Sequence, residues 1–150
     1  MDYKITENFS FYELTNTSHA ELIDENRRYA EGLKDNLNLL GILLQDIRDG
    51  INKPMTISSG VRSPELNKAV GGAKDSRHMK GLAADIQVKG MTALDVFTAI
   101  REMKLPSLHK AIIEGVKGKE WVHVQCRTAT DTAPTQYFAT KDGKNYTRVG

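Results

Sequence analysis

The stretch that decides the interpretation of this chain is Ser76-Arg77-His78-Met79-Lys80-Gly81-Leu82-Ala83-Ala84-Asp85. It starts in a polar loop that carries His78 and ends in a predicted strand, residues 83–88, that carries Asp85. Gly81 lies between them and allows the chain to turn sharply. Along the strand, apolar residues alternate with Asp85, so its carboxylate is expected to point away from the core. The stretch therefore predicts an imidazole and a carboxylate held outside the core.

A second histidine, His123, lies in another predicted strand, residues 121–126, and shares a face with Trp121 and Gln125. Two imidazoles and one carboxylate form a standard ligand set for a catalytic zinc that keeps one position open for water. Such a zinc lowers the pKa of its water to about 7. A free carboxylate must then take the proton and pass it to the leaving amine. Glu120 is the candidate for this role.

The spacing of Glu120 and His123 sets a condition on that role. They are an odd number of residues apart, so on a regular strand they would face opposite sides. Both can reach one metal only if Glu120 lies on the incoming turn or on a β-bulge. Gly118 makes an irregular entry to the strand reasonable. The alternative is that Glu120 is a surface charge at the hairpin.

The composition of the chain excludes several classes of protein and of metal site. The chain has 150 residues, and its 21 Lys and Arg against 19 Asp and Glu give a net charge of +2. This predicts one domain, residues 1–150, and argues against a nucleic-acid binder or a polybasic membrane anchor. The single Cys126 cannot form a thiolate zinc cluster, and a buried, inert thiol is expected there. His19 and His109 have no ligand-type neighbours and are expected at the surface.

Periodicity predicts the elements around these residues. Helical spacing covers residues 26–47 and 92–103, and a short helix starts after Ser63, with Pro64 at its first position. Alternation predicts a strand that Gly60 ends, and a hairpin of strands 111–116 and 121–126 with its turn at Gly115–Lys119. Ser10 with Glu13 and Ser18 with Glu21 have capping-box spacing, and residues 71–80 are expected to form a loop. The fold class is α+β.

The segment around His78 and Asp85 resembles that of a known family. The pattern Ser-x-His-x-x-Gly-x-Ala-x-Asp of residues 76–85 resembles that of the zinc D-Ala-D-Ala carboxypeptidases. These are grouped with phage L-alanyl-D-glutamate endopeptidases and vancomycin-resistance D,D-dipeptidases in the Hedgehog/DD-peptidase fold. Residues 58–67 resemble the family's Ser-Gly-Tyr-Arg-Ser-Pro segment, with Val61 in place of Tyr. An acidic residue three positions before the last histidine is also a family feature, and the resemblance covers roughly residues 9–125.

The resemblance implies a role for each matched residue. His78, Asp85 and His123 would bind Zn²⁺. Glu120 would act as the general base and then as the acid. Arg62 would hydrogen-bond the scissile carbonyl or the tetrahedral oxyanion, for which a fixed guanidinium is well suited.

Two further residues complete the expected site. Ser76 would touch the substrate or brace the site, and Trp121 would either line the cleft or pack on the sheet. The expected fold is Hedgehog/DD-peptidase-like, a small antiparallel sheet with the N-terminal helices packed on one side.

The expected function is a zinc metallopeptidase that cuts peptidoglycan stem or cross-link peptides, in the manner of a phage or prophage lysis enzyme. The polar N-terminus lacks the pattern of an export signal, so synthesis in the cytoplasm is expected, with holin release or delivery by the virion. Neither nucleic acid nor stable membrane association is expected, and the protein is expected to be a monomer. The alternative is a non-catalytic, zinc-containing module that binds the cell wall or builds a virion.

Overall fold

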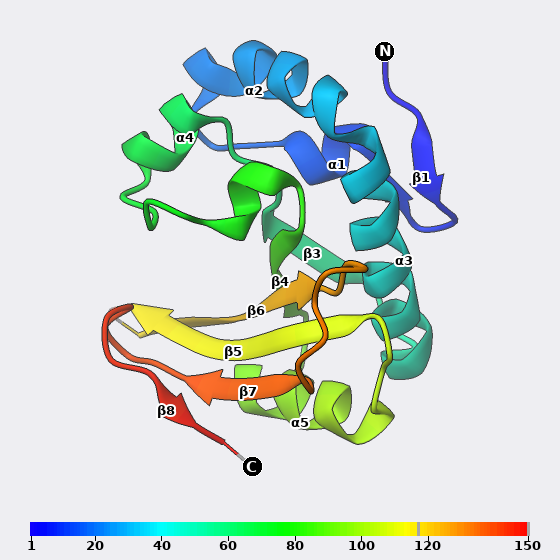
Figure 1. Ribbon diagram of the computed structural model, residues 1–150, viewed down its shortest axis with the longest axis vertical. Helices are drawn as coiled ribbons and strands as arrows, with labels where there is room; N and C mark the ends of the chain where they lie inside the picture. The colour runs from blue at the N-terminus through cyan, green and yellow to red at the C-terminus, as the bar shows by residue number, and fades with distance from the viewer. Residues whose placement is uncertain (117, 150) are drawn as a thin grey trace.

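The computed structural model describes residues 1–116 and 118–149 (Figure 1). Its α-helices are α1 (Phe11–Thr15), α2 (Ile23–Ala30), α3 (Lys34–Ile51), α4 (Pro64–Ala69) and α5 (Ala93–Met103). Short 3₁₀ turns are η1 (Ala20–Leu22), η2 (Glu31–Leu33) and η3 (Arg77–Lys80). The strands are β1 (Lys4–Thr6), β2 (Phe9–Ser10), β3 (Met55–Ser59), β4 (Ala83–Val88), β5 (Leu108–Val116), β6 (Lys119–Cys126), β7 (Gln136–Ala139) and β8 (Thr147–Arg148).

A six-stranded sheet in the order β3-β4-β6-β5-β7-β8 forms the centre of the molecule. Its neighbouring strands are antiparallel except for β5 and β7, which run parallel. Figure 1 shows α1, α2 and α4 gathered at one end of the molecule, with the sheet toward the other end. The expected α+β class with a mainly antiparallel sheet is confirmed.

One face of the sheet builds the hydrophobic core. On β4 and β6, alternate residues such as Ala84, Ile86, Val122 and Val124 are fully buried. They belong to the same apolar cluster as the inner faces of α3 and α5, which supply Leu37, Leu40, Leu44, Ile47, Val96, Phe97 and Ile100. Because strand side chains alternate between faces, the opposite face of β4 and β6 is left for polar residues.

Several predicted boundaries change. The helix expected over residues 26–47 is interrupted by η2, which contains Gly32, a residue that weakens helix interiors. The capping box of Ser10 and Glu13 forms, but Ser18 caps nothing, since η1 follows His19 and has no side-chain cap. The prediction of a second capping box is therefore wrong.

The regions between and after the predicted elements contain further structure. The expected loop over residues 71–80 includes η3, and the polar tail forms β7 and β8. The predicted hairpin is confirmed as β5 and β6; its turn includes Lys117, which lies outside the described residues. Within the described ranges, no helix combines the length and hydropathy that crossing a bilayer requires. The single domain over 1–150 stays a prediction.

Candidate metal centre

The three predicted ligands meet on the polar face of the sheet. One ligand atom each from His78, Asp85 and His123 lies within 4.8 Å of the other two. Asp85 Oδ1 is 3.3 Å from His78 Nε2 and 3.0 Å from His123 Nδ1. All three residues are buried. The cluster is thus compact enough for one ion to contact all three side chains.

Strand pairing and one short turn bring the ligands together. In the antiparallel pairing of β4 and β6, Asp85 lies directly opposite His123, so both side chains share a face. His78 comes from η3, whose first turn is capped by Ser76 Oγ, which accepts a hydrogen bond from the His78 backbone N–H. Gly81 ends η3 at a φ of +70°, a conformation that a residue with a Cβ adopts at a cost. This turn leads the chain into β4.

The hydrogen bonds of His78 indicate that a cation belongs in the centre. Its Nδ1–H donates to the carbonyl oxygen of Gly60 at 2.8 Å, because a carbonyl can only accept. Burial lowers the pKa of His78, so the ring is neutral and Nε2 carries a lone pair. That lone pair faces Asp85 Oδ1 across 3.3 Å. Two facing acceptors repel each other unless a cation lies between them, so the residues fit a metal ion.

The second oxygen of Asp85 is held from the other side. Arg62 Nη2 lies 3.4 Å from Asp85 Oδ2, while Arg62 Nε donates to Ser59 Oγ and Nη1 to Asn67 Oδ1. Burial by itself would raise the pKa of Asp85, but the hydrogen bond from His123 Nδ1 helps to hold it well below its usual value. The carboxylate is therefore ionised, with Oδ1 turned to the two imidazoles and Oδ2 to the guanidinium.

The structure does not bring Glu120 to this centre. In the pairing of β5 and β6 Glu120 lies opposite Gly115, and the register from there to His123 is regular, without the bulge that its role requires. Its side chain is exposed and lies with Thr56 and Gln87 around a separate depression of the surface. The strand period places it on the face opposite His123.

A different carboxylate, Glu114, lies beside the cluster. It is paired with Trp121 across the hairpin, and its Oε1 is 4.0 Å from His123 Nδ1. Trp121 Nε1–H donates to the same oxygen at 2.8 Å. Burial raises the pKa of Glu114 above its ordinary value. The signal that could have found it is the hairpin register, which puts Lys110, Ile112 and Glu114 on the face of His123.

The remaining predicted residues line one cavity with the ligands. Arg62, Ser76 and Trp121 all border it, as do Glu114 and residues of the C-terminal segment such as Tyr146. His109 also borders the cavity and is 14% exposed, so the expectation of a surface group is wrong for it. The side chain of His19, in contrast, is 38% exposed and pairs with Glu21.

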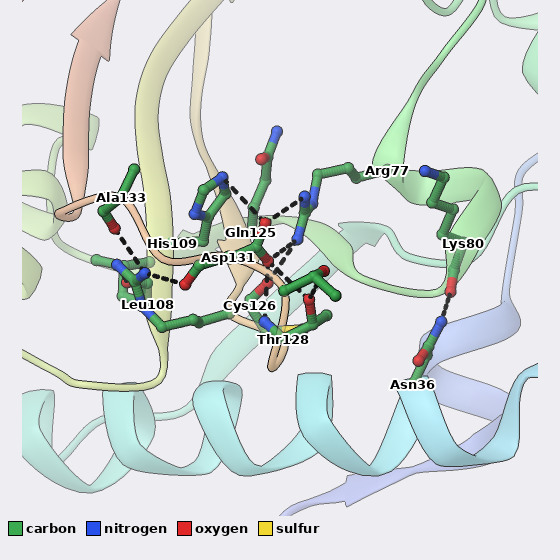
Figure 2. A network of polar contacts seen from close by, with 12 residues as sticks. Asn36, Arg77, Lys80, Leu108, His109, Gln125, Cys126, Thr128, Asp131 and Ala133 are labelled. Carbon is green, nitrogen blue, oxygen red and sulfur yellow. Dashed lines mark hydrogen bonds and ion pairs between the residues drawn. The ribbon is translucent and has the colours of Figure 1, made fainter.

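The segment after β6 is tied to the ligand-bearing turn η3. Arg77 Nη2 donates to Asp131 Oδ2 at 2.7 Å and to the carbonyl of Cys126 at 3.0 Å (Figure 2). The same carboxylate accepts hydrogen bonds from the backbone N–H and the hydroxyl of Thr128. Figure 2 shows His109 and Gln125 beside this network. The residue next to His78 is therefore anchored to the far end of β6.

Comparison with known proteins agrees with this geometry. A stretch of 44 residues is 50% identical to the zinc D-Ala-D-Ala carboxypeptidase of Streptomyces albus G. The stretch is 29% of this chain and 17% of that relative, so the chain matches only a small part of the relative's length. The sequence model of the Peptidase M15 family matches residues 15–125, which contain His78, Asp85 and His123, and the chain therefore belongs to the Peptidase M15 family.

Proposed function

We propose that this protein is a zinc-dependent peptidase that hydrolyses a peptide bond in the stem or cross-link peptides of peptidoglycan. The observation that carries the proposal is the buried cluster of His78, Asp85 and His123, which shares a cavity with Glu114 and Arg62. Membership of Peptidase M15 and the partial match to a zinc D-Ala-D-Ala carboxypeptidase support it. The bond cut is a D,D bond or the L-Ala-D-Glu bond.

The ligand set suits Zn²⁺, which binds imidazole nitrogens and carboxylate oxygens and keeps an open position when three protein ligands hold it. When bound, the ion would polarise the scissile carbonyl and lower the pKa of a water molecule. His78 Nε2, Asp85 Oδ1 and His123 Nδ1 would hold the ion, because both ring nitrogens face Asp85 Oδ1.

Glu114 is the proposed general base, in place of Glu120. Its carboxylate lies on the ligand face, and the indole N–H of Trp121 holds Oε1 in position. Burial raises its pKa, which makes it a better proton acceptor than an exposed glutamate. It takes a proton from the attacking water and delivers it to the nitrogen of the leaving amine. Trp121 therefore positions Glu114, in addition to any contact that it makes with the substrate.

Arg62 is the proposed stabiliser of the oxyanion. Hydrogen bonds to Ser59, Asn67 and Asp85 hold the guanidinium at the edge of the cavity, so little reorganisation is needed as charge develops. Ser76 supports the site through η3, since its hydroxyl caps the turn that carries His78. Action on the cell wall as a monomeric phage or prophage lysis enzyme is part of the same proposal and rests on the resemblance alone.

The test compares two matched carboxylate variants on purified, zinc-loaded protein. Glu114→Gln keeps the shape and the Trp121 contact but removes the base, so kcat should fall about 10²–10⁴-fold with zinc content unchanged. Glu120→Gln should leave kcat unaltered. The assay measures new free amines from peptidoglycan, with and without chelator, and mass spectrometry of the products identifies the bond.

The outcomes separate the candidates. Loss of activity in Glu120→Gln together with an active Glu114→Gln would reinstate the role expected from the sequence. Absence of cleavage by zinc-loaded wild-type protein would refute the peptidase and favour the cell-wall-binding or virion module.

A further inference from the structure

Gln125 makes a contact with the metal centre that no role yet accounts for. It follows His123 by two residues on β6, so both side chains lie on the same face. The Nε2 atom of its carboxamide is 3.0 Å from His123 Nε2. Gln125 also borders the cavity that holds the three ligands, and its side chain is half-buried.

The position of the two ring nitrogens defines what this contact does. His123 Nδ1 faces Asp85 Oδ1 at 3.0 Å and is the atom available to a metal ion. A neutral imidazole that binds a metal through Nδ1 must carry its proton on Nε2. The partner of that N–H is the carboxamide of Gln125, and among the described residues no other side chain is hydrogen-bonded to Nε2.

A carboxamide suits both states of the ring, because it has an accepting oxygen and a donating nitrogen. Without a metal, His123 Nδ1–H donates to Asp85 Oδ1 and the Gln125 amide donates to the lone pair on Nε2. If a metal held Nδ1, the ring proton would lie on Nε2, and a turned-over amide would accept it through its oxygen. Partners of this kind fix the tautomer and orientation of metal-bound histidines, and their loss typically costs about 10–100-fold in metal affinity.

We propose that Gln125 is a positioning residue that sets the tautomer of His123, with its amide oxygen accepting the Nε2–H of the metal-bound ring. The inference rests on the proposed zinc function and extends it to a residue outside the ligand set. It follows that an acceptor at position 125, and not the size of the side chain, determines how tightly the centre holds zinc.

Three variants of the full chain test this. Gln125→Leu removes the acceptor at similar size, and Gln125→Glu keeps an acceptor and removes the donor. Gln87→Leu is the matched control, since Gln87 lies on the neighbouring strand β4, donates to the backbone carbonyl of Glu120 and is not among the residues that line the cavity of the three ligands. Zinc affinity is measured by competition with a chromophoric chelator. The protonation of the His123 ring in the zinc-loaded protein is read from its ¹⁵N chemical shifts.

Gln125→Leu should bind zinc about 10–100-fold more weakly than the wild type, while Gln125→Glu should bind at least as tightly. Gln87→Leu should match the wild type. The ¹⁵N shifts should place the proton on Nε2 in wild type and Gln125→Glu. Wild-type affinity in Gln125→Leu, or an equal loss in Gln125→Leu and Gln125→Glu, would overturn the proposal.

The same measurements distinguish this inference from the function on which it rests. Wild-type protein that binds zinc and does not cleave peptidoglycan would refute the peptidase and leave the role of Gln125 supported. A wild-type protein that takes up no zinc would overturn both.

Discussion

Each ligand side chain of the centre has its own hydrogen-bond partner. Gly60 holds His78, and Gln125 contacts His123. Arg62 lies against the outer oxygen of Asp85. Partners of this kind orient ligands before the metal arrives, which reduces the entropy lost on binding. At the scale of single residues, the centre is therefore largely preformed.

Cys126 illustrates what burial does to a single reactive group. Its side chain is 1% exposed, and burial raises the pKa of the thiol to about 12. Since the thiolate is the reactive species, native protein at pH 8 should react with a disulfide reagent at least about a thousand-fold more slowly than an exposed cysteine. Urea-unfolded protein is the control and should react at the ordinary rate. Rapid labelling of the native state, followed by absorbance, would contradict the burial.

Whether a single site residue could be predicted from the sequence depended on how close it lies along the chain to its partners. His78 and Asp85 lie within one ten-residue pattern, so their association could be predicted from the chain alone. Glu114 could not be chosen in the same way, since its proximity to His123 depends on which residues face each other across the β5–β6 hairpin. Sequence spacing favoured Glu120, which lies on the other face.

Among the elements, η3 is held by the backbone of Gly60, which itself lies close to the backbone of Leu14. The Gly60 carbonyl receives His78 Nδ1–H, and a Cβ on Gly60 would overlap the backbone oxygen of Leu14. Gly60→Ala should therefore lower the free energy of unfolding by about 1–3 kcal/mol and weaken zinc binding, because the carbonyl must shift. Gly32→Ala is the control: the added Cβ meets nothing within 4 Å, so its stability should stay equal or rise. Urea titration and chelator competition measure both quantities. Equal stability of the two variants would show that the contact with Leu14 relaxes freely.

The Arg77–Asp131 ion pair connects η3 to the segment that follows β6. The hydrogen bond from Arg77 lowers the pKa of Asp131 below its ordinary value of 3.8. A carboxyl whose pKa is lower in the folded state stabilises the fold above its unfolded pKa, and this stability is lost as pH falls through the folded value. At neutral pH Asp131→Asn should lower the free energy of unfolding by about 1–3 kcal/mol.

The difference between Asp131→Asn and the wild type should shrink as the pH falls below about 4, where the carboxyl of the unfolded state takes up its proton, and should vanish only below the lowered pKa of the folded state. Urea titrations over a pH series measure it. A difference that stays constant into acid would show that the lost hydrogen-bond geometry, and not the charge, accounts for the effect.

The elements themselves were predictable where a period repeats over enough residues. The strands 83–88 and 121–126 and the helix 92–103 follow from alternation and helical spacing. β7 and β8 are short, and β7 is held by parallel pairing with β5, which is distant in sequence. Neither has a local pattern from which to predict it. The break at η2 contains Gly32, a single weak helix former inside an otherwise periodic run.

At the scale of the whole molecule, the centre joins three parts of the fold. His78 belongs to η3, Asp85 to β4 and His123 to β6. Since an unfolded chain does not present these ligands together, zinc should stabilise the folded state by mass action.

Free zinc at 100 times its dissociation constant should add about 2.7 kcal/mol. For a chain of this size that raises Tm by roughly 5–10 °C. Differential scanning fluorimetry of protein treated with chelator and then with zinc measures the shift. Asp85→Ala should show no zinc-dependent shift, and a shift of equal size in that variant would place the ion elsewhere.

The sequence by itself determined the class of the fold and predicted the three proposed ligands. The reason is that those signals are local: a ten-residue pattern, the strand period and the helical spacing. Only the tertiary structure decided which carboxylate joins the ligands and which amide contacts His123. The pairing register of β4, β5 and β6 sets which side chains share the face of His123, and it puts Glu114 there with Gln125 and excludes Glu120. That pairing joins residues whose proximity no local pattern specifies.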